Sequence, residues 1–134
     1  MLKVSDIMVR KTLALTDDMG LPAAVDTIVE SGLLGLPVVD NNNTLIGFLS
    51  EQDCLQQLMT ESYHCDSHIT VARLMRRNPL SVSEELTVFA LGQLMGKEKP
   101  KIYPVTRDQK LVGIVTRGHI VSALSDSLQQ CKAF

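Results

Sequence analysis

The sequence predicts an α/β fold built from two successive units of one plan, each running strand, helix, strand, strand, helix. Three segments occur twice along the 134 residues, at a nearly constant offset. In each copy, short β-rich runs alternate with stretches whose apolar residues recur at helical spacing. Because two similar units in one small chain usually pack together, the cleft between them is where a ligand is expected.

The repeat rests on three matched segments. The matches are 4–8 with 71–75, 36–39 with 103–106, and 45–50 with 111–116. The first two are offset by 67 residues and the third by 66, because one residue is lost from the loop between the last two segments. The predicted boundaries are repeat 1 at 1–59, a connector at 60–70, repeat 2 at 71–128 and a tail at 129–134.

Repeat 1 is predicted to open with an extended run at 12–15 and a helix cap at 16–18. The helix that follows tolerates Pro22 in its first turn and ends at Gly32. Its apolar positions are Leu21, Ala24, Val25, Ile28 and Val29. The polar turn at 40–43 separates two strands of a hairpin. Those strands are 36–39 and 45–49, and Ser50 then opens a helix with an apolar face of Cys54, Leu55, Leu58 and Met59.

Repeat 2 is predicted to follow the same plan. Its parts are a strand at 80–82, a cap at 83–85, a helix at 86–95, a Lys-rich turn at 96–101 and a hairpin of 102–105 with 110–115. The last helix should face inward through Ile120, Val121, Leu124 and Leu128. The polar connector at 60–70 is predicted to be irregular, and residues 131–134 are predicted to form a loose end of the chain.

Composition narrows the class of protein. Hydrophobic residues make up 45% and aromatic residues 4%, with no Trp, so we expect a folded chain with an aliphatic core. The net charge of −2 argues against nucleic acid as a main partner. The sequence has no apolar run long enough for a membrane span or a signal peptide. Three scattered cysteines favour free thiols and a cytoplasmic location.

Three motifs each occur twice, namely a Val-x-x-Ile/Leu-Met opening, an x-Pro-Val strand and a Gly-aliphatic-aliphatic-Ser/Thr strand end. Together they resemble a tandem pair of CBS domains, or Bateman module. The resemblance covers about residues 4 to 128. It implies two βαββα repeats packed with pseudo-two-fold symmetry and two clefts, in a stand-alone module that dimerises into a flat disc. It also implies a regulatory role rather than catalysis, with AMP, ADP, ATP or S-adenosylmethionine as ligand and no required cofactor.

Ser50 and Asp53 are the leading candidates for ligand contact. They lie where a strand gives way to a helix, and free N–H groups at a helix start attract anions. A carboxylate one turn on can accept two hydrogen bonds from vicinal ribose hydroxyls. The resemblance assigns this role to the Ser/Thr-x-x-Asp motif, which Ser50 and Asp53 match. The same spacing is also a capping box, in which both side chains serve only the backbone.

In the family each cleft joins both repeats, so the resemblance implies that the Asp53 cleft is completed by a second set of residues. That set is Arg77, Asn78, Pro79, Leu80, Ile102, Tyr103 and Pro104. Leu80 and Ile102 would sandwich the adenine ring, and backbone groups would read its edge. Arg76 and Arg77 are the candidates for phosphate charge, with a solvated pair of side chains as the alternative.

Repeat 2 departs from the motif. Thr116 keeps the hydroxyl, but the acid is replaced by His119. Because neutral imidazole has one acceptor nitrogen, it cannot hold two ribose hydroxyls as a carboxylate does. We therefore expect the second cleft to bind no ribose, to bind it weakly, or to take another anion with help from Arg117.

Two functional hypotheses follow. In the first, an adenosine ligand in the Asp53 cleft shifts the arrangement of the repeats and so alters contacts with an unknown effector protein or within a homodimer. In the second, the chain is an interaction scaffold with a vestigial nucleotide site. The helix faces at 21–29 and 86–95 are the predicted dimer surfaces. Metal binding has little support, since the cluster His64, Cys65, Asp66 and His68 matches no zinc pattern. Catalysis also has little support, because the sequence has no nucleophile elbow, Gly-rich phosphate loop or paired-acid motif.

Overall fold

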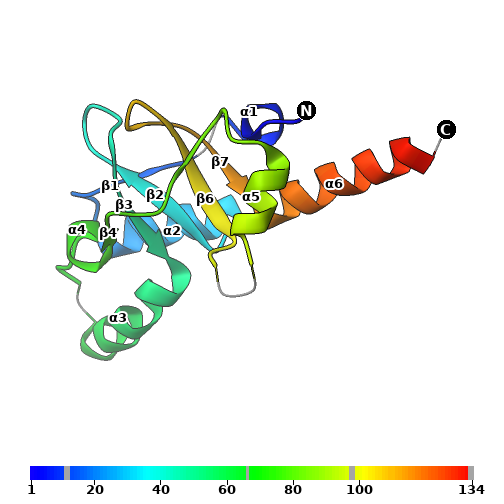
Figure 1. Cartoon of the computed structure of the whole chain (residues 1–134). Helices are drawn as coiled ribbons and strands as arrows, with labels where there is room; N and C mark the ends of the chain where they lie inside the picture. The colour runs from blue at the N-terminus through cyan, green and yellow to red at the C-terminus, as the bar shows by residue number, and fades with distance from the viewer. Residues whose placement is uncertain (11–12, 66, 97–98, 133–134) are drawn as a thin grey trace. The chain divides into compact units, whose positions relative to one another are not determined.

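The computed structural model of this chain describes residues 1–10, 13–65, 67–96 and 99–132 (Figure 1). It divides into two compact units. One, the central unit, is the continuous stretch Leu13–Pro79. The other, the terminal unit, combines Met1–Thr12 with Leu80–Phe134. The predicted α/β fold class, with two repeats, is confirmed.

The central unit holds a four-stranded sheet in the order β1-β2-β3-β4. Strand β1 is parallel to β2, whereas β2–β3 and β3–β4 are antiparallel. Its elements are β1 (Leu15–Thr16), α2 (Leu21–Ser31), β2 (Gly35–Val39), β3 (Leu45–Ser50), α3 (Glu51–His64), α4 (Val71–Leu74) and β4 (Arg76–Arg77). The predicted hairpin is thus present, and Gly32 ends α2 in the left-handed conformation at φ 71°, where glycine has no steric penalty.

The terminal unit repeats this plan with a three-stranded sheet in the order β5-β6-β7. Strand β5 is parallel to β6, and β6 is antiparallel to β7. Its elements are α1 (Val4–Ile7), β5 (Val82–Ser83), α5 (Val88–Leu94), β6 (Ile102–Arg107), β7 (Lys110–Thr116) and α6 (Arg117–Lys132). In place of a fourth strand, Val9 forms an isolated bridge to Ile114.

The two short helices that open the sequence repeats are exchanged between the units. In α1 of repeat 1, the backbone N–H of Val4 donates to the carbonyl of Leu86 in repeat 2, at 2.8 Å. In α4 of repeat 2, the N–H of Val71 donates to the carbonyl of Met19 in repeat 1, at 2.9 Å. Each unit therefore contains the opening helix of the other repeat, so the compact units differ from the predicted sequence repeats.

Each unit has its own aliphatic core, as the composition predicts. The central core includes Leu15, Leu21, Ala24, Ile28, Leu36, Val38, Leu49, Cys54, Val71 and Met75. The terminal core includes Val4, Met8, Val82, Val88, Leu91, Met95, Tyr103, Val105, Val115, Ile120 and Ala123. Met8 and Met75 occupy matching positions, which fits the role of methionine as an adaptable core residue.

The predicted starts of the first strands and helices need correction. β1 begins at Leu15 and β5 at Val82, later than the predicted runs, and Thr12 lies outside the described residues. Helix α2 is capped by Gly20 and not by 16–18, because the Thr16 hydroxyl donates instead to the Asp18 carboxylate at 2.7 Å. Helix α5 is capped by Thr87, two residues beyond the predicted cap at 83–85.

The second helix of each repeat is also longer than predicted. Helix α3 continues into the predicted connector as far as His64, and α6 continues into the predicted tail as far as Lys132. The polar composition of the predicted connector and tail favours an irregular chain, but polar residues are also tolerated on the solvent face of a long helix. Of the positions expected to face inward on α6, Ile120 is buried, whereas Val121, Leu124 and Leu128 are exposed.

Candidate functional site

Ser50 and Asp53 form a reciprocal cap at the start of α3. The backbone N–H of Asp53 donates to Ser50 Oγ at 3.1 Å, and the N–H of Ser50 donates to Asp53 Oδ2 at 3.1 Å. Two N–H groups that a helix start leaves without partners are thereby satisfied. The capping interpretation of this motif is therefore realised, and it fixes the carboxylate of Asp53 at the strand–helix junction.

The second oxygen of Asp53 is held by Arg76 from β4. Arg76 Nε donates to Asp53 Oδ1 at 3.2 Å, and Nη2 lies 3.1 Å from the same oxygen. The Asp53 side chain is 16% exposed, whereas that of Arg76 is 67% exposed. The site thus pairs a mostly buried Asp53 side chain with an Arg76 side chain that is largely in solvent.

Sheet pairing brings these two residues together from 23 positions apart in sequence. Arg76 is opposite Phe48 in the β3–β4 ladder, two residues before Ser50. On the other side of β3, Gly35 is opposite Ser50. An added Cβ at Gly35 would lie 2.7 Å from the carbonyl oxygen of Leu49 and 2.8 Å from Ser50 Cα. The absence of a side chain at Gly35 is therefore what permits this close approach at the helix start.

Sequence reasoning proposed Arg76 for phosphate charge and missed its contact with Asp53. Spacing within one strand or helix gives no indication of a pair formed across a sheet. The matched repeats offered an indirect signal, because Val9 in repeat 1 corresponds to Arg76 and His119 in repeat 2 corresponds to Asp53. Both charges of the pair are absent from the other unit.

Three further predicted residues follow Arg76 in the central unit. Arg77 is exposed and is opposite Gly47 in the ladder. Because successive side chains of a strand point to opposite faces, Arg77 and Arg76 are directed to different sides of the sheet. Asn78 has a left-handed φ of 54°, which asparagine adopts more readily than most residues, and it leads into Pro79.

The remaining predicted contacts belong to the terminal unit. Leu80 is 56% exposed, whereas Ile102, Tyr103 and Pro104 are buried in β6. Burial raises the pKa of the Tyr103 phenol above its ordinary value of 10.0. The structure brings Ser50, Asp53 and Arg76 together within the central unit. Their meeting with Leu80 and the β6 residues in one cleft stays a prediction.

Thr116 and His119 reproduce the cap in the terminal unit with an imidazole as acceptor. The N–H of His119 donates to Thr116 Oγ1 at 3.2 Å, and the N–H of Thr116 donates to His119 Nδ1 at 3.1 Å. An imidazole whose Nδ1 accepts a hydrogen bond carries its proton on Nε2. This unit therefore presents an N–H donor where the central unit presents a carboxylate acceptor.

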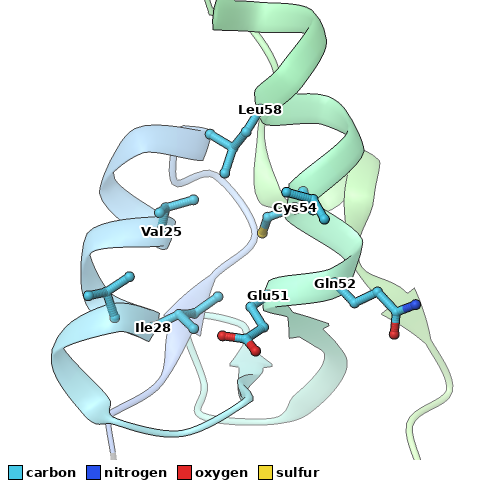
Figure 2. Close-up of a pocket in the computed structure, with 8 residues that line it drawn as sticks. Val25, Ile28, Glu51, Gln52, Cys54 and Leu58 are labelled. Carbon is cyan, nitrogen blue, oxygen red and sulfur yellow. The ribbon is translucent and has the colours of Figure 1, made fainter.

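A groove of about 550 Å³ lies between α2 and α3 in the central unit (Figure 2). Figure 2 shows Cys54 between the two helices, with Val25 and Ile28 opposite it on α2. Burial, followed by the negative charge of Asp53, raises the pKa of the Cys54 thiol. The residues that line the groove are Val25, Ile28, Val29, Glu51, Gln52, Cys54, Leu55 and Leu58. Asp53 does not line it, so the groove is separate from the Asp53–Arg76 pair.

In the described part of the chain, no three His, Cys, Asp or Glu side chains gather so that they could hold a metal ion, and Asp66 of the cluster at 64–68 lies outside that part. Across the same ranges, no helix has both the length and the apolar character needed to cross a membrane. Cys54, Cys65 and Cys131 are all free thiols.

A family model described as CBS domain matches this chain twice, over residues 4–60 and 71–126. The chain is 27% identical over 129 residues to an A-adding tRNA nucleotidyltransferase of Aquifex aeolicus, an alignment that covers 96% of this chain and 15% of the enzyme. It is 29% identical over 130 residues to the chloroplastic CBS domain-containing protein CBSX2 of Arabidopsis thaliana, covering 75% and 53% respectively. The chain thus spans only part of the length of these curated relatives.

Solved structures show the same fold. A crystal structure of CBSX2 in complex with AMP matches with a TM-score of 0.79 at 29% identity, covering 94% of this chain and 98% of that one. AcuB from Vibrio cholerae matches with a TM-score of 0.85 at 25% identity, covering 100% and 98%. In both cases the match extends over both repeats, so the pairing of two such units is a shared feature.

Proposed function

This chain belongs to the CBS-domain family, as a tandem pair, and on that premise we propose that it is a regulatory module that binds an adenosine-containing ligand at Asp53. The observation that carries the proposal is the fixed carboxylate at the start of α3 with an arginine beside it. A carboxylate accepts hydrogen bonds from ribose hydroxyls, and a guanidinium pairs with phosphate. The arrangement therefore suits a nucleotide.

The relatives support the choice of ligand class. CBSX2, at 29% identity, has been crystallised in complex with AMP. We take AMP as the first probe and ADP, ATP and S-adenosylmethionine as the comparison set. In the proposed cleft, Leu80 and Ile102 contact the adenine ring and Arg77, Asn78 and Pro79 line the edge next to Asp53. Tyr103, Pro104 and Thr116 complete the predicted set.

We propose that the ligand acts by its different affinity for two arrangements of the repeats, because a ligand shifts a conformational equilibrium only to that extent. The changed state would pass to an effector protein or to a second copy of this chain. In this role the chain performs no catalytic step and requires no cofactor. Its three free thiols suit a reducing compartment such as the cytoplasm.

Self-association is proposed through exposed apolar helix faces. On α2 and α3, Val29 is 72% exposed, Leu55 56% and Met59 67%. On the matching helices α5 and α6, Phe89 is 62% exposed and Val121 61%. Leu55 and Val121 are equivalent positions of the repeat, so both units offer the same kind of surface, which a second copy can cover with a like surface.

Light scattering tests this dimer directly. The expected mass is twice the 14.7 kDa of one chain, and Leu55→Lys is expected to shift it toward 14.7 kDa. Gln56→Lys changes an exposed residue beside it to the same side chain and is expected to leave the dimer intact. A wild-type mass of one chain at micromolar concentration would contradict the dimer.

A scaffold role without a ligand is the second candidate, because one observation favours it. Asp53 already has partners within the chain for both oxygens, namely the Ser50 N–H and Arg76. In addition, the cap at Thr116 and His119 persists in the terminal unit without the acid. The motif therefore has a structural use that would maintain it after loss of ligand binding.

Thermal shift with AMP separates the two candidates. At a hundredfold excess over the dissociation constant, binding stabilises the folded chain by about 2.7 kcal/mol, a rise of several degrees. Asp53→Asn keeps an oxygen to accept the Ser50 N–H but loses the charge and one acceptor, so the stability should change little while the AMP response falls. If wild-type protein shows no response to any adenosine compound, the scaffold is the better account.

A further inference from the structure

The pair formed by Arg76 and Asp53 marks a difference between two otherwise equivalent sites. Arg76 is opposite Phe48 in the central unit, and Val9 bridges to Ile114 in the terminal unit at the equivalent place of the repeat. The acid Asp53 is matched by His119. Both charges are therefore present in one unit and both are absent from the other, which indicates that the arginine and the carboxylate act together.

We propose that Arg76 is a displaceable partner of Asp53 that makes this site select phosphorylated adenosine ligands over uncharged ones. The inference rests on the proposed function and names the class of ligand within it. In the structure Arg76 pairs with the carboxylate of Asp53. When ribose hydroxyls take its place, the guanidinium moves to a phosphate on the same ligand.

The acceptor capacity of Asp53 requires such an exchange. A carboxylate has about four lone-pair positions, two on each oxygen. The Ser50 N–H uses one on Oδ2, Arg76 Nε uses one on Oδ1, and Arg76 Nη2 lies 3.1 Å from Oδ1. With Arg76 in place, two guanidinium nitrogens lie against Oδ1, so Oδ2 is the oxygen open to a further donor. A vicinal diol that donates twice to the carboxylate must therefore displace Arg76 from Oδ1.

The exposure of Arg76 allows the exchange. Its side chain is 67% exposed, and an ion pair between a solvent-screened arginine and a carboxylate is weak. Release exposes little new surface, because most of the Arg76 side chain is already in water. The Ser50–Asp53 cap does not involve Arg76, so the carboxylate keeps its position at the start of α3 when the arginine leaves.

The exchange affects charged and uncharged ligands differently. Adenosine would displace Arg76 without offering it a new partner, so the lost ion pair weakens adenosine binding. AMP supplies a phosphate, with which a guanidinium forms charge-assisted hydrogen bonds. Arg76 thus opposes adenosine and favours AMP. A residue that only maintained the fold of the site would affect the two ligands alike.

The test is calorimetric titration of adenosine and AMP into the full chain, as wild type and as Arg76→Met, which keeps an unbranched stem and removes the charge. We expect Arg76→Met to bind adenosine at least as tightly as wild type and AMP about tenfold more weakly, the effect of a lost charged hydrogen bond. Arg76→Lys should restore part of the preference for AMP. Arg73→Met, an exposed arginine of α4 in the same unit, is the matched control for net charge.

Each outcome is decisive. If Arg76→Met weakens adenosine and AMP by the same factor, or if Arg73→Met reproduces its effect, Arg76 does not select for phosphate, while the proposed function stands. If wild-type protein binds neither compound, this inference fails. The proposed function fails with it only if ADP, ATP and S-adenosylmethionine also do not bind. A fall in AMP affinity with adenosine unchanged or improved supports the exchange.

Discussion

The imidazole of His119 takes the structural place of a carboxylate, because its Nδ1 accepts the backbone N–H of Thr116 at 3.1 Å. In the central unit Asp53 does the same for Ser50, also at 3.1 Å. The cap of the last helix is thus conserved in geometry while its charge differs. One position can therefore keep its structural role with either a carboxylate or an imidazole.

Variants of His119 should separate these two roles. His119→Ala removes one hydrogen bond at the start of α6 and is expected to lower the free energy of unfolding by about 1 kcal/mol. His119→Asp restores a carboxylate acceptor near a helix N-terminus, where negative charge is favourable, so stability should equal or exceed wild type. Urea denaturation measures both, with Gln129→Ala on the same helix as control. Equal loss in the two His119 variants would show that the imidazole itself is needed.

Gly35 should be intolerant of a side chain. A Cβ there would lie 2.7 Å from a backbone carbonyl oxygen and 2.8 Å from Ser50 Cα, atoms that move only with the strand. Gly35→Ala is therefore expected to destabilise the chain by about 1–3 kcal/mol. Gly96→Ala is the matched control, because its added Cβ would meet nothing within 4 Å. Thermal melts of the two variants compare them, and equal melting temperatures would contradict the prediction.

The Glu84–Arg107 ion pair predicts a dependence of stability on pH. Glu84 accepts from Arg107 Nε, and this hydrogen bond lowers the pKa of the Glu84 carboxyl below its ordinary 4.5. A lowered pKa means that the stabilisation is complete above the unfolded-state value and is lost as the pH falls through the folded-state value. Glu84→Gln should therefore be less stable than wild type at pH 7, with the difference shrinking in acid below pH 4.5.

Urea denaturation at pH 7 and pH 3 measures this convergence. Glu30→Gln, an exposed carboxylate on α2, serves as control and should differ little from wild type at either pH. A difference between Glu84→Gln and wild type that stays constant from pH 7 to pH 3 would show that the ion pair does not contribute.

Cys54 should react slowly with thiol reagents in the folded chain. Its side chain is 1% exposed, and burial with the nearby Asp53 charge raises its pKa, so little thiolate is available. Cys65 and Cys131 are exposed and should be alkylated first. Mass spectrometry after timed iodoacetamide treatment gives the order, and unfolding in urea should abolish it. Early labelling of Cys54 in native protein would contradict the prediction.

The repeat made the fold class predictable, because it fixed the order of elements before any single motif was interpreted. Local sequence patterns then correctly predicted helix ends where one residue determines the backbone conformation, as Gly32 does at the end of α2 and Ser50 at the start of α3. They failed at 60–64 and 131–132, where a polar composition is equally compatible with an exposed helix. The caps at 16–18 and 83–85 failed because Thr16 and Ser83 have closer partners in their own turns.

The candidate site was predictable in part for a related reason. Ser50 and Asp53 are three residues apart, so their spacing specified the contact. Arg76 reaches Asp53 through the β3–β4 ladder, and pairing between distant strands leaves no periodic signature in the sequence. The exchange of α1 and α4 likewise depends on contacts such as Val4 with Leu86, which no local pattern encodes.

The exchange of the opening helices also determines the order in which the two units can fold during synthesis on the ribosome. The central unit is one unbroken stretch, so all its partners exist once Pro79 has emerged. The segment that precedes the central unit differs, since Val4 must wait for Leu86 and Val9 for Ile114. At about 5–20 residues per second, that wait is on the order of ten seconds. This segment is thus translated before the central unit but can complete its contacts only after it.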